Sequence, residues 1–546
     1  MKDWPNLAAM FFDQAARLGD APFLWAKRIG TFQPLTWREA SAQTAAIAAA
    51  LTARGIGPGD RVMLLSENRP EWATADIAIM AAGGVTVPAY VTNAPADNAY
   101  LLEHSGAKGV IVSGPALEAK LPPGCGFIIS MERDWRALTS RRAEIPVCTA
   151  ARADTACVIY TSGTGGRPKG VMLSHGAILS NCVGAYLALE DLGLGHEVFL
   201  SFLPLSHAYE HTAGLYFPIM IGAEIYYTEA EALAADLATV RPTLMTSVPR
   251  LYETMHARIT RGVKRKGGFS ETLFTRTVAL GLAKYEGRAL SLTERLHDTL
   301  GEALVRRKIK AAFGGRMKAM ISGGAPLNAE IGKFFTALGL TILQGYGQTE
   351  SAPIVSVNLK RINRIDTVGP PMKGVEVRIA PDGEILVRGE LVMQGYWRDE
   401  AATAAALQHG WLHTGDVGEI DAAGRIRITD RKKDIIVVSG GDNVAPQRIE
   451  GLLTLEPEIA QAMVYGDRRP HLVALIVAEP EASPAAVAVA VERVNARLAA
   501  IERVRRFAVA PEGFTIANGM LTPTLKARRG VIIERYRDVL EGLYRG

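Results

Sequence analysis

A glycine-rich loop is the first stretch of the sequence whose residue types could do chemistry. It reads YTSGTGGRPKG over residues 160–170. Glycine has no Cβ atom, so the backbone of such a loop can approach a phosphate, and its successive N–H groups can form an anion-binding nest. Hydroxyl groups and a lysine add donors and a positive charge. We expect the loop to hold a nucleoside triphosphate. Its candidate ligands are Thr161, Ser162, Gly163, Thr164, Gly165, Gly166 and Lys169.

The loop differs from two widespread phosphate-binding loops. A Walker loop ends in Gly-Lys-Ser/Thr, which is missing here, and the dinucleotide fingerprint needs a glycine where Pro168 stands. A serine hydrolase is disfavoured because the sequence contains no Gly-x-Ser-x-Gly elbow. A glycine-rich surface loop is the simpler alternative. We expect the loop to lead from a strand at 156–160 into the start of a helix near 171–179.

Two more glycine-containing turns, SGGAPLN (322–328) and QGYGQTES (344–351), each follow an apolar run. A Gly-Gly corner lets a flat ring approach the backbone, and Tyr346 offers an aromatic face for stacking. Glu350 is a hard oxygen ligand suited to Mg²⁺. A structural role for the tyrosine is the alternative. The residues expected to face a nucleotide here are Gly323, Gly324, Ala325, Gly345, Tyr346, Gly347, Thr349 and Glu350.

The last third of the chain holds two further candidate sites. Asp416 is expected in a tight turn of HGWLHTGDVGEID, where it could accept both hydroxyls of a ribose, and Arg431 could do the same from the other side. The alternative is that these residues only stabilise the turn and form an ion pair at the surface. Lys526 lies in LTPTLKARR, a short stretch of the basic tail, where a solvated surface lysine is the alternative reading.

Length and composition limit the number of domains and the kind of partner that can be expected. The 546 residues exceed what one hydrophobic core usually serves, so two or more domains are expected. Apolar residues make up 48% and charged residues 21%, which is typical of globular proteins. The net charge of +5 is too small for this length to indicate a nucleic-acid partner. Residues 491–546 alone carry 11 basic and 6 acidic side chains, so this tail is either a solvated basic surface or a movable cationic module.

Cysteine usage and the start of the chain predict a cytoplasmic protein. The four cysteines show no C-x-x-C spacing, so free thiols in a reducing compartment are expected. The first residues do not resemble a signal peptide. The apolar stretch 77–90 is too short and too interrupted to span a bilayer, although loose membrane association through an apolar surface remains open.

The order of apolar runs predicts an α/β fold of layered subdomains. Strands expected at 61–66, 109–114 and 156–160 alternate with Ala-rich amphipathic stretches, which favours parallel strands. The basic, helix-prone stretch 255–312 predicts a helical insertion. Residues from about 352 to 430 are expected to form a β-rich subdomain, with its clearest strands and Asp-Gly and Ala-Gly turns from 374 on. We place the boundary of an N-terminal domain (1–430) and a small mobile α+β domain (431–546) at the charged run DRKKD.

In this order and spacing, the four motifs resemble those of the acyl-adenylate-forming superfamily, which includes acyl-CoA synthetases, firefly luciferase and the adenylation domains of peptide synthetases. The resemblance covers nearly the whole chain. It is closest to long-chain fatty acyl-CoA synthetases, on three features: the insertion 255–312, the segment HGWLHTGDVGEIDAAGRIRITDRKK, and the ending TPTLKARR. Other branches usually have glycine before the late lysine, where this chain has Leu525.

The resemblance implies a role for each nucleotide-site residue. Residues 161–169 would hold the β- and γ-phosphates, and Thr349 would contact the α-phosphate. Gly323, Gly324 and Ala325, with Tyr346, would hold the adenine, Glu350 would bind Mg²⁺, and Asp416 and Arg431 would bind the ribose. In one departure, Gly165 stands where the family usually has Thr or Ser, which removes one hydroxyl donor, so we expect phosphate binding to be weakened or rearranged.

The resemblance also assigns residues to the acid and to coenzyme A. His207 would flank the acyl carboxylate, and residues 208–227 would help to line the acyl pocket. Lys526 would bridge the α-phosphate and the carboxylate. Lys433 would be the hinge that rotates the C-terminal domain for the second half-reaction, and the Gly440–Gly441 pair would then pass close to the pantetheine arm.

The function implied is that of an AMP-forming acid–CoA ligase with ATP, Mg²⁺ and coenzyme A as partners, acting on a carboxylic acid that is expected to be a long-chain fatty acid. Three alternatives remain open. The acceptor could be the thiol of a carrier protein, the acid could be aryl or medium-chain, or the chain could be an inactive nucleotide- or lipid-binding relative. The sequence does not predict an oligomeric state.

Overall fold

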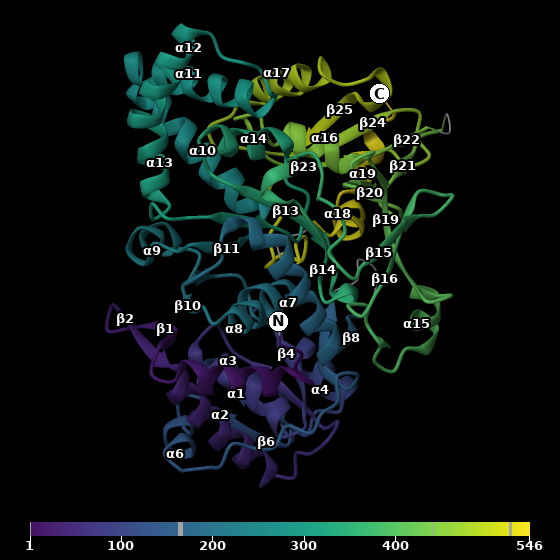
Figure 1. Ribbon diagram of the computed structural model, residues 1–546. Coiled ribbons are helices and arrows are strands. Elements are labelled where there is room, and N and C mark those ends of the chain that lie inside the picture. Colours follow the sequence, from purple (N-terminus) through teal and green to yellow (C-terminus); the bar gives the residue numbers. More distant parts are fainter. Residues whose placement is uncertain (1, 162–166, 440–441, 523–526, 546) are drawn as a thin grey trace.

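The structure is a computed structural model and describes residues 2–161, 167–439, 442–522 and 527–545 (Figure 1). Two large sheets, a smaller antiparallel sheet and a C-terminal module build the molecule. The mixed α/β class expected from the sequence is confirmed. None of the helices in the described part of the chain is both long and apolar enough to cross a bilayer.

The first large sheet has seven strands in the order β17-β8-β7-β4-β3-β5-β6. The strands from β3 to β7 are parallel, and β8 and β17 are antiparallel additions at one edge. The expected strands at 61–66, 109–114 and 156–160 are confirmed as β3, β5 and β7. The strand bounds are β3 (Arg61–Leu65), β4 (Val85–Ala89), β5 (Gly109–Val112), β6 (Phe127–Ser130), β7 (Thr155–Thr161), β8 (Lys169–Ser174) and β17 (Gly395–Tyr396).

The second large sheet has eight strands in the order β14-β13-β12-β11-β9-β10-β1-β2. Its central strands are parallel, and their short apolar runs are almost fully buried, as in parallel sheets covered on both faces. The strand bounds are β1 (Pro22–Arg28), β2 (Thr31–Thr36), β9 (Val198–Ser201), β10 (Glu224–Tyr227), β11 (Leu244–Ser247), β12 (Ala319–Ser322), β13 (Ile342–Gly347) and β14 (Ile354–Val357).

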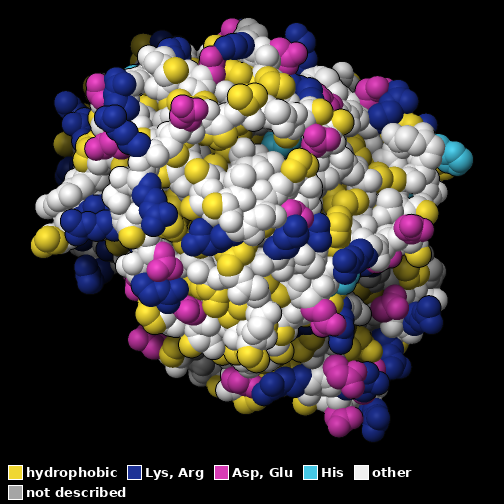
Figure 2. All heavy atoms as spheres, turned by 90° about the horizontal axis from the view of Figure 1, so that it is seen from below, with side chains coloured by type: hydrophobic (Ala, Val, Ile, Leu, Met, Phe, Trp, Pro, Cys, Tyr) yellow, Lys and Arg dark blue, Asp and Glu magenta, His cyan; other side chains and the backbone are white. Residues whose placement is uncertain are grey.

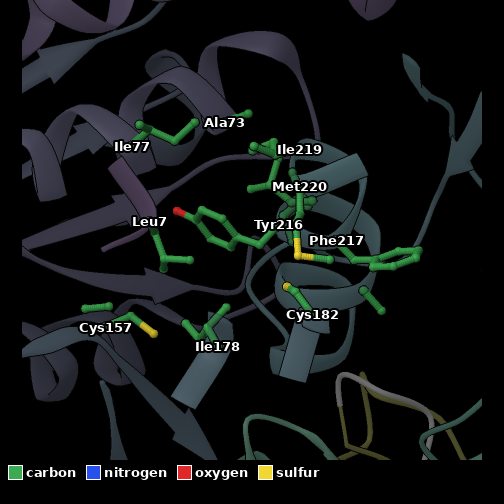
Figure 3. Close-up of a cluster of buried hydrophobic side chains, with 14 of the residues drawn as sticks. Leu7, Ala73, Ile77, Cys157, Ile178, Cys182, Tyr216, Phe217, Ile219 and Met220 are labelled. Carbon is green, nitrogen blue, oxygen red and sulfur yellow. The ribbon is translucent and has the colours of Figure 1, made fainter. Parts of the chain in front are cut away.

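Helices and one π-helix join the two sheets into a single core. Figure 3 shows Tyr216 among apolar side chains that come from α1, α3, β7, α7 and α8. The Tyr216 hydroxyl donates a 2.6 Å hydrogen bond to buried Asp76 on α3, so its one polar atom is satisfied. The helix bounds are α1 (Leu7–Leu18), α2 (Trp37–Thr52), α3 (Pro70–Ala81), α4 (Pro95–Ser105), α5 (Pro115–Glu118), α6 (Trp135–Thr139), α7 (His175–Leu189), η2 (Glu210–Tyr216), α8 (Phe217–Ile221), α9 (Leu233–Val240) and α14 (Ala329–Ala337).

The stretch 255–312, expected as a helical insertion, is helical and connects β11 to β12. Its first helix begins earlier than expected, at Pro249, because proline is well suited to the first position of a helix. The insertion stands at the top of Figure 1, at the opposite end from α1 and α2. Its elements are α10 (Pro249–Lys266), α11 (Gly268–Tyr285), α12 (Leu292–Gly301), the π-helical turn η3 (Glu302–Arg306) and α13 (Arg307–Ala312).

An antiparallel sheet follows, with the turns Asp382-Gly383 and Ala423-Gly424 between its strands, as the sequence predicts. The expected range from 352 is too wide. Strand β14 pairs with β13 and belongs to the eight-stranded sheet, and β17 pairs with β8 in the seven-stranded sheet. The elements of this unit are β15 (Glu376–Ile379), β16 (Glu384–Arg388), α15 (Glu400–Ala406), β18 (Leu407–Gln408), β19 (Trp411–Ile420) and β20 (Ile426–Arg431).

The C-terminal module has its own hydrophobic core. Two clusters of buried apolar side chains lie wholly within residues 436–540. The domain boundary that we propose at 430–431 precedes the first residue of these clusters. The elements are β21 (Ile436–Val437), β22 (Asn443–Val444), α16 (Pro446–Leu453), β23 (Ile459–Tyr465), β24 (Leu472–Ala478), α17 (Pro484–Asn495), β25 (Val504–Val509), α18 (Arg529–Arg535) and α19 (Arg537–Gly542).

Candidate functional site

A pocket of about 380 Å³ lies at the carboxyl ends of β7, β12 and β13. Ligands of open α/β sheets commonly bind outside the carboxyl ends of the strands. Of the residues predicted from the sequence, the pocket is lined by Thr161, Lys169, His207, Gly323, Gly324, Gly345, Tyr346, Gly347, Thr349, Glu350, Arg431 and Lys433. Ala325 does not line it, and Asp416 lies behind Tyr346. The predicted site residues that lie outside the described residues are Ser162, Gly163, Thr164, Gly165, Gly166, Gly440, Gly441 and Lys526.

The strands on either side of the glycine-rich loop pair with each other. Strands β7 and β8 are antiparallel, with Thr161 opposite Lys169, so both ends of the loop open into the pocket. The expectation that a helix starts directly after the loop is wrong, because residues 169–174 pair as a strand and α7 begins only at His175. The Lys169 ammonium lies 5.0 Å from the centroid of the Tyr396 ring and 3.8 Å from the Asp399 carboxylate. Its positive charge is therefore held beside the loop.

A tyrosine and an arginine of the pocket wall are linked through a buried aspartate. The Tyr346 hydroxyl donates a 2.8 Å hydrogen bond to Asp416 Oδ2, and Arg431 Nε lies 3.2 Å from Asp416 Oδ1. Burial, and then the nearby Asp416 charge, raise the pKa of Tyr346 well above its usual value, so this phenol is a donor at neutral pH. Each carboxylate oxygen can still accept a second hydrogen bond, as a ribose site requires.

The position of Asp416 differs from the expected tight turn. Asp416 lies within strand β19, directly opposite Arg431 on β20, and the pairing shifts register just after it. The expected approach of Arg431 from the other side is therefore wrong, since the two side chains are cross-strand neighbours on the same sheet. Cross-strand neighbours of opposite charge attract each other, so the Asp416 carboxylate is held between Arg431 and the Tyr346 hydroxyl.

Close packing at two glycines shapes the base of the pocket. A Cβ atom on Gly323 would lie 3.0 Å from the ring of Tyr209, and one on Gly347 would lie 1.7 Å from the carbonyl oxygen of Pro353. The Tyr209 hydroxyl donates a 2.8 Å hydrogen bond to the Ile321 carbonyl, which holds the ring against the Gly323 backbone. The ring that approaches this glycine is thus a side chain of the protein itself.

Glu350 is an acidic side chain in the pocket wall. Its Oε1 accepts a 2.9 Å hydrogen bond from the Tyr396 hydroxyl, and its backbone carbonyl accepts one from the Met393 N–H. In the described part of the chain, no group of three or more His, Cys, Asp or Glu side chains could hold a metal ion. One carboxylate fits the usual protein contribution to Mg²⁺ at nucleotide phosphates, where the phosphates and water supply the other ligands.

His207 and the π-helix η2 form the wall next to Gly323. The Tyr209 N–H donates to His207 Nδ1 at 3.2 Å, which indicates that the neutral ring carries its proton on Nε2. Glu210 is fully buried, and its carboxyl group accepts hydrogen bonds from the hydroxyls of Ser201 (2.6 Å) and Thr246 (2.5 Å). Burial raises the pKa of Glu210 to about 7, although both hydroxyls lower it. These bonds fix η2 to the ends of β9 and β11.

The C-terminal module contributes directly to the pocket. Thr522 and Ala527 line it, on either side of residues 523–526. Lys433 also lines it, and burial followed by the neighbouring Arg431 charge lowers the pKa of Lys433. Outside the pocket, Asn328 Nδ2 donates a 2.8 Å hydrogen bond to the Gly451 carbonyl on α16. The module is thus seated on the pocket side of the N-terminal sheets.

Comparison with known families matches the two parts of the chain separately. The family described as "AMP-binding enzyme" matches residues 11–397, and "AMP-binding enzyme C-terminal domain" matches residues 433–546. The chain is an AMP-binding enzyme. Among the curated relatives of this AMP-binding enzyme, Long-chain-fatty-acid–CoA ligase FadD15 of Mycobacterium bovis is 35% identical, with 99% of this chain and 97% of the relative covered. Long chain acyl-CoA synthetase 7, peroxisomal, of Arabidopsis thaliana is 31% identical, with 94% of this chain and 82% of the relative covered.

Solved structures share the fold of this AMP-binding enzyme. O-succinylbenzoate coenzyme A synthetase (MenE) from Bacillus subtilis, in complex with AMP, has a TM-score of 0.73 at 22% identity, with 96% of this chain and 98% of that chain covered. ATP-bound MatB from Rhodopseudomonas palustris has a TM-score of 0.76 at 22% identity, with 98% of this chain and 100% of that chain covered. The similarity covers the C-terminal module as well as the two large sheets.

Sequence reasoning missed three tyrosines in the pocket of the AMP-binding enzyme, of which Tyr90 directly follows β4. Tyr209 lies in the stretch 208–227 that was expected to contact the acid, but its ring packs on Gly323. Tyr396 reaches Glu350 and Lys169 because β17 pairs with β8, a contact between distant parts of the sequence. The sequence carries no signal for that pairing, since a two-residue strand has no recognisable period.

Proposed function

We propose that this chain is an ATP-dependent fatty acid–CoA ligase that converts a long-chain fatty acid, ATP and coenzyme A into acyl-CoA, AMP and pyrophosphate. The observation that carries the proposal is the convergence of three distant parts of the chain on one pocket. They are Thr161 and Lys169 at the two ends of the glycine-rich loop, Arg431 with its ion-pair partner Asp416 behind the pocket wall, and Thr522 and Ala527 on either side of residues 523–526. The full-length similarity to proteins named long-chain-fatty-acid–CoA ligase supports the class of acid.

In this proposal the nucleotide runs across the pocket from Tyr346 to the glycine-rich loop. Tyr346 and the backbone of Gly323 and Gly324 hold the adenine, and Asp416 and Arg431 bind the ribose hydroxyls. The glycine-rich loop and Lys169 hold the β- and γ-phosphates. Thr349 contacts the α-phosphate, while Glu350 supplies the protein ligand of Mg²⁺, which would neutralise phosphate charge.

The first half-reaction is a displacement at phosphorus. A carboxylate oxygen of the acid attacks the α-phosphorus, the bond from that phosphorus to the bridging oxygen breaks, and pyrophosphate leaves with the bonding electrons. The residues mainly position the reactants and stabilise negative charge. Lys526 contacts both the α-phosphate and the carboxylate, and His207 flanks the carboxylate.

The second half-reaction transfers the acyl group to sulfur. The thiolate of coenzyme A attacks the carbonyl carbon of the acyl-adenylate, and AMP leaves with the oxygen of the broken anhydride bond. Lys526 has to move away first, so the C-terminal module rotates about Lys433. In the rotated position the Gly440–Gly441 pair lies along the pantetheine arm. Thr522 and Ala527 in the pocket wall support our assignment of the described position to the first half-reaction.

We further propose a cytoplasmic enzyme that contacts a membrane surface. The four cysteines are all free and none pairs in a disulfide, which fits a reducing compartment. A fatty acid of long chain partitions into bilayers, so an enzyme that uses it gains from working at their surface.

Acid-dependent pyrophosphate–ATP exchange tests the function. Purified protein is given Mg·ATP and labelled pyrophosphate with acids of increasing chain length and with aryl acids. We expect exchange that is strongest with long-chain fatty acids, and acyl-CoA formation when coenzyme A replaces pyrophosphate. Transfer only to a carrier-protein thiol would contradict the CoA assignment. Normal ATP binding without exchange for any acid would contradict the enzyme activity itself.

A further inference from the structure

The helical insertion is much longer than its place in the fold requires. It occupies residues 248–318 between the neighbouring parallel strands β11 and β12. A connection between parallel strands needs only about a dozen residues. The extra length forms the helices α10 to α13 at one end of the molecule (Figure 1). This excess of ordered chain indicates a role beyond connecting two strands.

Four leucines form an exposed apolar stripe on this insertion. Leu292, Leu296, Leu300 and Leu304 follow one another at four-residue spacing along α12 and η3, and their exposed fractions are 83%, 73%, 41% and 42%. Residues four apart are neighbours on a helix surface, so the side chains form one continuous stripe. Contiguous exposed apolar surface of this kind is typical of an interaction site.

The stripe lies in the most basic part of the protein. Residues 249–312 hold 14 Lys and Arg but only 6 Asp and Glu, a net charge of +8, which exceeds the +5 of the whole chain. Arg295 follows Leu292 by three residues, and Arg307 and Lys308 follow Leu304 by three and four. These three side chains are exposed, and none forms an ion pair with a described residue. Apolar and cationic groups therefore share one surface.

The opposite end of the molecule has a different surface. The view from below shows Lys and Arg side chains interspersed with Asp and Glu (Figure 2). Outside residues 249–312 the chain has 47 basic and 50 acidic side chains, a net charge of −3. The insertion thus carries the largest share of the positive excess, with a second share of +5 in residues 491–546 of the C-terminal module.

We propose that the leucine stripe of α12 and η3, with Arg295, Arg307 and Lys308, docks on the surface of an anionic lipid bilayer. The inference rests on the proposed function, because the membrane would be the source of the long-chain acid. Leucines enter the interface between head groups and acyl chains, while arginine and lysine contact lipid phosphates. The base of the insertion is at the pocket, since Ser247 of β11 donates a 2.8 Å hydrogen bond to the Ile321 carbonyl in the pocket wall.

A second copy of the chain fits this surface less well. A two-fold contact through the stripe would bring two insertions together that each carry a net charge of +8, which is unfavourable. Stable interfaces bury roughly 800 Å² on each partner. A stripe of four leucines, two of them already more than half covered, provides much less.

Vesicle binding tests the proposal. The full-length protein is sedimented with vesicles of phosphatidylcholine, with and without a quarter of phosphatidylglycerol. We expect the wild type to bind the anionic vesicles, with an affinity that falls as salt is added. The variant L292S/L296S should bind them with an affinity lower by a factor on the order of ten. The variant R295Q/R307Q/K308Q is expected to lose affinity for anionic vesicles by about fivefold per charge, with little change on neutral ones.

A matched control lies in the loop before β7. Ile145 and Val147 are exposed apolar residues beside the exposed Arg141 and Arg142. The variant I145S/V147S is expected to bind vesicles like the wild type, and all variants should keep wild-type exchange with a short, water-soluble acid. Equal vesicle binding by the wild type and L292S/L296S overturns the proposal, as does a stripe-dependent dimer without vesicle binding. A failure of the exchange reaction in every protein would instead contradict the proposed function.

Discussion

At the scale of single residues, Asp416 is the acceptor on which Tyr346 and Arg431 converge. We expect D416N to raise the KM for ATP by about ten- to a hundredfold, because hydrogen bonds to a charged group contribute about 1.5–3 kcal/mol each. The amide keeps the shape of the side chain, so the fold should be retained. The check is acid-dependent exchange at varied ATP concentration.

The matched control for D416N is E419Q on the same strand. Glu419 is exposed and pairs with Arg427 at the surface, so its neutralisation should leave the KM for ATP unchanged. Equal effects of the two variants would show that Asp416 acts through the general field of the protein and has no direct contact with the nucleotide.

Lys526 carries the second prediction at this scale. We expect K526A to raise the barrier to adenylate formation by roughly 3–4 kcal/mol, because it removes one preorganised charge from the displacement. The rate of adenylate formation should fall by a factor of about several hundred. Thioester formation from supplied acyl-adenylate should stay close to that of the wild type. Single-turnover assays of each half-reaction measure both. R505A removes an exposed arginine of β25 and should change neither, while equal losses in both half-reactions of K526A would contradict the assignment.

The sequence identified the residues of the pocket that belong to short motifs. Glycines, Tyr346 and Glu350 were predictable because their chemistry is local to one turn. Tyr396 was not, since its contact with Glu350 depends on a strand pairing between distant segments. The packing of the Tyr209 ring on Gly323 is not predictable from the sequence either, because it joins two distant segments.

At the scale of elements, the π-helix η2 is attached to the sheet through the carboxyl group of Glu210. Its pKa is raised from 4.5 to about 7 by burial, so the folded protein holds a proton that the unfolded chain loses. This group's contribution to stability is therefore complete below about pH 4.5 and is lost as the pH rises through about 7.

We expect the free energy of unfolding to fall by about 1 kcal/mol between roughly pH 6.5 and pH 8.5 on account of Glu210. The variant E210Q removes the titration and should flatten this slope, as measured by urea unfolding at several pH values. The variant D430N is a useful comparison. Burial raises the pKa of Asp430 only to about 6, so the titration of this group changes the free energy of unfolding at lower pH than that of Glu210. An unchanged slope in E210Q would contradict the assignment.

Elements with a clear hydrophobic pattern were predictable, and those defined by their partners were not. Strands β3, β5 and β7 are apolar runs, and the insertion has long helix-prone stretches. The sequence predicts a strand followed by a helix where β7 and β8 pair, since VMLS suits a strand or a helix until its partner strand is known. For the same reason the sequence does not predict that β14 pairs with β13 in the eight-stranded sheet.

At the scale of the whole molecule, the two half-reactions need two positions of the C-terminal module. We expect K433P to retain adenylate formation and to lose thioester formation by at least about a hundredfold, because proline fixes one backbone dihedral at the proposed hinge. Rapid-quench measurements of adenylate and acyl-CoA check this. The control K433A removes the same side chain but leaves the backbone free, so it should keep both steps. Loss of the adenylate in K433P would indicate damage to the pocket.

The two-residue strand β17 has a practical consequence for anyone who divides this chain into parts. It covers the outer edge of β8, although it arrives more than 200 residues later. A fragment that stops short of Gly395 would leave the backbone N–H and C=O groups of that edge open to any other strand, and such edges promote self-association. Truncations designed for crystallisation or for display should therefore extend beyond Tyr396, even where the deleted segment looks like a peripheral loop.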